Sequence, residues 1–62
     1  MQVKVGDLIT LLEQDGYYIL VERDEYYGAV PPHWWKVQSL TSGKEGPFWD
    51  IEPRMVLVNE SR

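Results

Sequence analysis

The residues whose types could perform chemistry are the single histidine, His33, and two carboxylates spaced by two positions, Asp50 and Glu52. A histidine acts as a general base only beside a partner group in a pocket, and no serine or cysteine motif accompanies His33. Asp50 and Glu52 would share one face of a strand, where paired acids can be catalytic. A solvated face, or an ion pair with Arg54 or Lys44, explains them as well. The sequence therefore predicts no catalytic residue and no enzyme.

The stretch DEYYGAVPPHWWKV, residues 24–37, concentrates aromatic rings and acids near two prolines. Aromatic side chains flanked by acids can hold a proline-rich segment and its basic residues, or stack on a cation. The other interpretation is that the rings only cap the open ends of a small domain that has little other packing area. On the first interpretation, the predicted partner-binding residues are Glu22, Asp24, Glu25, Tyr26, Tyr27, Trp34 and Trp49.

Length and composition limit the kinds of site that this chain can build. With 62 residues it is expected to be one domain, residues 1–62, with a frayed tail at residues 59–62. No cysteine is present and histidine occurs once, so neither a disulfide framework nor a metal site is predicted, and no cofactor. The net charge of −4 disfavours nucleic acid and favours basic protein partners. No leader or membrane-spanning run is apparent, which predicts a cytoplasmic protein.

Strand signals dominate the chain. Residues 8–12 are rich in β-formers, and residues 14–16 form a glycine-containing turn into a second strand at residues 17–21. Helix propensity in Leu-Leu-Glu-Gln offers an alternative for the first element, but the flanking glycines leave it too short. Because residues 17–21 are almost continuously apolar, we expect that strand to be covered on both faces, by the core on one side and by a loop or a partner on the other.

The second half of the chain follows the same pattern. Pro31 and Pro32 cannot lie in a central strand, so residues 22–33 form a stiff loop. Residues 34–40 alternate with strand period, which turns Trp35 and Val37 inward and Trp34 outward. A turn at residues 41–46, a strand at 48–51, a 3₁₀ turn at 52–54 and a last strand at 55–58 complete an all-β chain.

The motifs VGDLITLLEQ, WWK, SGKEGPF and RMVLV, in this order, resemble the Src-homology-3 (SH3) family over about two-thirds of the chain. The resemblance implies a five-stranded antiparallel SH3-like barrel with a long loop between its second and third strands. It also implies that Trp34, which matches the first tryptophan of the family's pair, packs on proline-rich ligands. The family's Ala-Leu-Tyr-Asp-Tyr motif is missing, so the fold carries over better than the ligand.

The chain also resembles small SH3-like proteins encoded by bacteriophages, which begin with a similar Gly-Asp-Leu turn. This resemblance implies a non-enzymatic protein-binding module, either a virion accessory or a host-directed protein in the host cytoplasm. Two alternatives stay open. The domain could be a structural unit that self-associates through residues 17–21, or a small barrel that binds nucleic acid through its aromatics.

Overall fold

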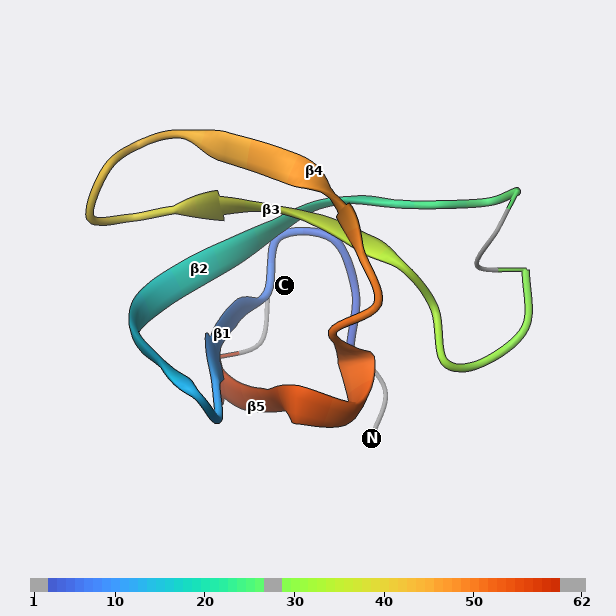
Figure 1. Ribbon diagram of the computed structural model, residues 1–62, viewed down its shortest axis with the longest axis horizontal. Coiled ribbons are helices and arrows are strands. Elements are labelled where there is room, and N and C mark those ends of the chain that lie inside the picture. The colour runs from blue at the N-terminus through green and yellow to red at the C-terminus, as the bar shows by residue number, and fades with distance from the viewer. Residues whose placement is uncertain (1–2, 27–28, 60–62) are drawn as a thin grey trace.

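The protein folds as one curved antiparallel sheet, seen in a computed structural model that describes residues 3–26 and 29–59 (Figure 1). Its five strands follow one another in the order β4-β3-β2-β1-β5. A short 3₁₀ helix, η1, precedes the last strand, as predicted. The bounds are β1 Leu8–Leu11, β2 Gln14–Arg23, β3 Trp35–Ser39, β4 Glu45–Trp49, η1 Glu52–Arg54 and β5 Met55–Asn59. The predicted all-β class is confirmed.

The sheet is not closed into a barrel, which corrects one part of the prediction. β5 pairs with β1 and β4 pairs with β3, so β4 and β5 are the two edges. Pro47 lies within β4 and has no N–H to donate, which suits an edge strand. The arrangement is a small five-stranded antiparallel sheet, compatible with an SH3-like small β fold.

The first hairpin turns earlier than the sequence suggested. Leu11 pairs with Gln14, so the turn is at Leu12 and Glu13, and the predicted turn residues 14–16 belong to β2. Gly16 has φ +99°, a conformation that side-chain-bearing residues rarely adopt. The register changes between the Leu11–Gln14 pair and the Ile9–Tyr18 pair. Gly16 therefore lies at an irregularity within β2 and not in the hairpin turn.

The connection between β2 and β3 lies later in the chain than predicted, at residues 24–34, because β2 continues to Arg23 and β3 begins at Trp35. Arg23 pairs with Trp35, and the Asp24 N–H donates to the Trp34 carbonyl at 2.9 Å. The described parts of the connection extend beyond the sheet (Figure 1). His33, near its end, lies edge-on to the Trp35 ring with the two centroids 6.5 Å apart.

Seven buried apolar side chains from the described residues form the core on one face of the sheet, which we call the inner face. Trp35 and Val37 are among them, so their predicted inward orientation is confirmed. Within the described residues, the strand at residues 17–21 is fully covered on one face only. Leu20 is fully buried, whereas Tyr17 is 52% exposed. The core residues are Ile9, Leu11, Leu20, Trp35, Val37, Ile51 and Met55.

Two polar side chains tie peripheral segments to this core. The Trp35 indole Nε1–H donates to a carboxylate oxygen of Glu52 at 2.9 Å, which links β3 to η1. The buried Asp7 carboxylate accepts the Lys4 backbone N–H at 2.8 Å and lies 3.3 Å from the Lys4 Nζ. Both contacts satisfy groups that would be costly to bury without a partner. Glu52 thereby has a structural contact that links η1 to the core.

Candidate functional site

The adjacent tryptophans Trp34 and Trp35 lie on opposite faces of the sheet. Trp35 is 1% exposed and belongs to the core, whereas Trp34 is 39% exposed. The backbone bond between Asp24 and Trp34 extends the β2–β3 ladder by one pair beyond Arg23 and Trp35. Since side chains alternate along a strand, Trp34 and Asp24 lie on the face away from the core, the outer face.

Three further side chains share the outer face around Trp34. Glu22 pairs across the ladder with Lys36, and Lys36 pairs in turn with Phe48 on β4. Directly paired residues of antiparallel strands project to the same side, and Trp34 and Lys36 are two positions apart. We call the resulting set the outer-face patch: Glu22, Asp24, Trp34, Lys36 and Phe48.

Contacts within the outer-face patch give it a partly fixed surface. The Lys36 Nζ lies 5.1 Å from the centroid of the Phe48 ring, within the range of a cation–π interaction. Asp24 Oδ1 accepts the backbone N–H of Tyr26 at 2.7 Å, which orders the chain as it leaves β2. Glu22 is exposed. The patch thus offers an indole face beside carboxylates, a combination that holds guanidinium and ammonium groups.

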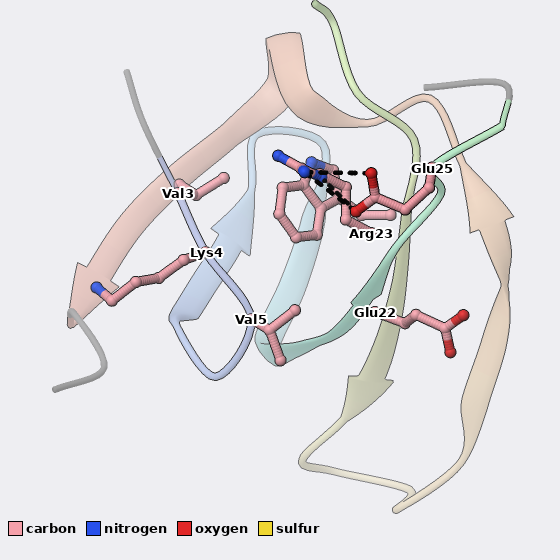
Figure 2. Close-up of a pocket in the computed structure, with 7 residues that line it drawn as sticks. Val3, Lys4, Val5, Glu22, Arg23 and Glu25 are labelled. Atoms are coloured by element: carbon pink, nitrogen blue, oxygen red, sulfur yellow. Dashed lines mark hydrogen bonds and ion pairs between the residues drawn. The ribbon is translucent and has the colours of Figure 1, made fainter. Parts of the chain in front are cut away.

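Glu25, a predicted binding residue, is directed elsewhere. Arg23 pairs with Trp35 and so lies toward the inner face, and its guanidinium donates to Glu25 Oε1 at 3.0 and 3.2 Å. Figure 2 shows Glu25 turned toward Arg23, whereas the Glu22 carboxylate points away from this pair. The charge of Glu25 is therefore neutralised locally by Arg23.

The remaining predicted residues are not gathered beside Trp34. Trp49 pairs with Trp35, so it lies on the inner side of the edge strand, where it is 37% exposed. Tyr26 is 82% exposed in the β2–β3 connection. Tyr27 lies outside the described residues. The structure brings together Glu22, Asp24 and Trp34 and separates them from Glu25 and Trp49.

Two members of the outer-face patch, Lys36 and Phe48, were missed by sequence reasoning. Lys36 carried a usable signal, because it is two positions from Trp34 on a strand of period two. Phe48 carried none, since its place depends on the β3–β4 register, which shifts between Lys36 and Gln38. Only the paired strands reveal that an aromatic ring supports the lysine.

A shallow recess, which Glu22 of the outer-face patch also lines, lies between the N-terminal segment and Trp35 (Figure 2). Its basic side chains, Lys4 and Arg23, are both paired with carboxylates, those of Asp7 and Glu25. In residues 3–26 and 29–59, no group of three or more histidine and acidic side chains could hold a metal ion. The same residues contain no helix long and apolar enough to cross a membrane.

Comparisons of this chain with protein-family models, with curated proteins and with solved structures found no match.

Proposed function

We propose that this protein is a non-enzymatic protein-binding module whose outer-face patch binds a basic segment of another protein. One observation carries the proposal: the β2–β3 ladder places the partly exposed Trp34 on the same face as the exposed carboxylate of Glu22, away from the core. Trp35 belongs to the core, whereas Trp34 lies on the other face and remains 39% exposed. A tryptophan kept at the surface beside acids is typical of binding surfaces, where tryptophan is enriched.

The resemblance to SH3 domains and to small bacteriophage barrels supports the same class of function and suggests its setting. On that basis we propose a virion accessory or a host-directed protein acting in the cytoplasm. A nucleic-acid partner is less well supported, because the patch contains two carboxylates and one lysine and lacks the basic groove that such binding requires.

The proposal predicts a sharp difference between two tryptophans of matched exposure. The probe is a fluorescent peptide with four arginines, compared by anisotropy with a peptide carrying glutamine in their place. Trp34→Ala should weaken binding of the arginine peptide at least about tenfold, the loss expected for an aromatic anchor. Trp49→Ala is the control, because Trp49 is 37% exposed against 39% for Trp34 but lies on the other side. It should leave binding within about twofold.

The proposal would be wrong if the wild-type protein bound both peptides equally, or if the two alanine variants weakened binding by the same factor. A thermal melt of each variant separates lost binding from lost folding. The contribution of the Glu22 charge is tested in the same assay by Glu22→Gln. The control is Glu45→Gln, which removes an exposed charge at the far end of β4. Glu22→Gln alone should raise the Kd, by about twofold to fivefold, as expected for a solvent-exposed ion pair.

A further inference from the structure

Three side chains form one row across the outer face of the sheet, one from each of three neighbouring strands. Glu22 on β2 pairs with Lys36 on β3, and Lys36 pairs in turn with Phe48 on β4. β3 lies between the other two strands. Lys36 therefore has a carboxylate on one side and an aromatic ring on the other, and both attract an ammonium group.

Lys36 contacts the ring and not the carboxylate. Its Nζ lies 5.1 Å from the centroid of the Phe48 ring. Among residues 3–26 and 29–59, the Glu22 side chain makes no ion pair or hydrogen bond. Figure 2 shows its carboxylate directed away from the ion pair of Arg23 and Glu25. The exposed charge of Glu22 is therefore not neutralised by the lysine directly across the ladder.

The two contacts open to Lys36 are similar in strength, because an exposed cation–π contact and an exposed ion pair both contribute little free energy. Loss of the ring would leave Glu22 as the cross-strand neighbour that attracts the Lys36 ammonium group. An ammonium group held by Glu22 would then compete for this carboxylate with the basic side chains of a partner. The ring thus selects between two arrangements of the same lysine.

We propose that Phe48 is a positioning residue of the outer-face patch, which holds Lys36 away from Glu22 and so keeps that carboxylate accessible to a basic segment. This inference rests on the proposed function, because it concerns the affinity of the same patch for the same class of partner. Phe48 acts through Lys36 and not through contact with the partner. The effect of Phe48 on binding must therefore depend on the charge of residue 36.

A double-mutant cycle tests this dependence with the arginine peptide and the anisotropy assay. Phe48→Leu keeps an apolar side chain without the ring and should raise the Kd about threefold to fivefold, the effect of a competing exposed ion pair. Phe48→Tyr keeps a ring and should bind within about twofold of the wild type. In a Lys36→Gln background, Phe48→Leu should change the Kd by less than about twofold, because no ammonium group remains to compete.

Tyr17→Leu is the matched control for Phe48→Leu. It makes a similar change of an aromatic ring to leucine on the outer face, where Tyr17 is 52% exposed, but away from the row of three side chains. The Kd of this variant should stay within about twofold of the wild type.

A measurement without peptide tests the placement of Lys36 itself. In the wild type, the Phe48 ring should shift the ε-methylene proton signals of Lys36 upfield and give nuclear Overhauser contacts to them. In Phe48→Leu, the upfield shift should be lost and contacts between Lys36 and the Glu22 side chain should appear. Contacts of Lys36 to Glu22 in place of Phe48 in the wild type would overturn the proposal.

The peptide results separate failure of this proposal from failure of the proposed function. If the wild type prefers the arginine peptide, but Phe48→Leu has no effect or has the same effect with and without the Lys36 charge, Phe48 is not a positioning residue and the proposed function stands. If the wild type binds the arginine and glutamine peptides equally, the proposed function fails and the role of Phe48 fails with it.

Discussion

Replacing Trp35 by alanine is expected to unfold most of the protein at 25 °C. Trp35 is 1% exposed, and its indole N–H is held by Glu52. Truncating a buried tryptophan costs about 3–5 kcal/mol. A core in a domain of this size rarely supplies more than about 3–5 kcal/mol in total. The expected loss is therefore as large as the total free energy of unfolding. In a urea titration followed by circular dichroism, the variant should show little folded protein even without denaturant.

Trp34→Ala is the natural control, because it makes the same chemical change one residue away. Trp34 lies on the outer face and is partly exposed, so its truncation should cost no more than about 1 kcal/mol. Equal loss of stability in the two variants would contradict the opposite orientations of the two rings. Glu52→Ala probes the bond to η1, and leaving the indole N–H without its acceptor should cost about 1–3 kcal/mol.

Replacing Leu20 by alanine should cause the second large loss of stability, about 2–5 kcal/mol. Leu20 is fully buried at the centre of β2, with Val37 directly across the ladder. The measurement is the shift of the urea midpoint at constant slope. Because the total stability of the domain is small, the variant is expected to be partly unfolded at room temperature.

Two variants bracket the effect of Leu20→Ala. Leu40→Ala removes the same atoms from a residue that is 51% exposed and should change stability by no more than about 0.5 kcal/mol. Tyr17→Ala tests the outer face of β2, where Tyr17 is 52% exposed, and should cost far less than Leu20→Ala. A larger loss from Tyr17 than from Leu20 would contradict the assignment of Leu20 to the inner face.

Much of the fold followed from local patterns. The alternation from residue 34 onward predicted correctly that Trp35 and Val37 are buried and that Trp34 is not. The short 3₁₀ turn predicted at residues 52–54 has the observed bounds of η1. These features depend on neighbours within a few residues, which a sequence displays directly.

The features that failed or stay open depend on contacts between distant segments. The apolar run at residues 17–21 suggested cover on both faces, but composition cannot say what lies over the second face, and within the described residues Tyr17 is 52% exposed. Closure of the barrel required β4 and β5 to pair, and the sheet leaves both as edges. Gly16 was predicted to lie in the turn. Glycine tolerates a positive φ, which both turns and strand irregularities require, so the residue type alone does not distinguish the two positions.

The candidate site shows the same division. Trp34 could be assigned to the surface from its own strand. Its companions could not, because the register of β2, β3 and β4 decides that Glu22 and Phe48 join it. The same register directs Arg23 toward the inner face, where it pairs with Glu25, and it places Trp49 across from Trp35. A cluster that looks continuous in the sequence is thus divided between two sides of the sheet.

The proposed binding face is tested most directly by the indole N–H signals of the three tryptophans in a ¹⁵N spectrum during titration with the arginine peptide. Each tryptophan gives one such signal, so Trp34, Trp35 and Trp49 are observed separately in the intact protein. We expect the Trp34 signal to shift progressively to saturation, while the Trp35 signal, held by Glu52, stays in place. A Trp34 signal that does not move while that of Trp49 does would contradict binding at the outer-face patch.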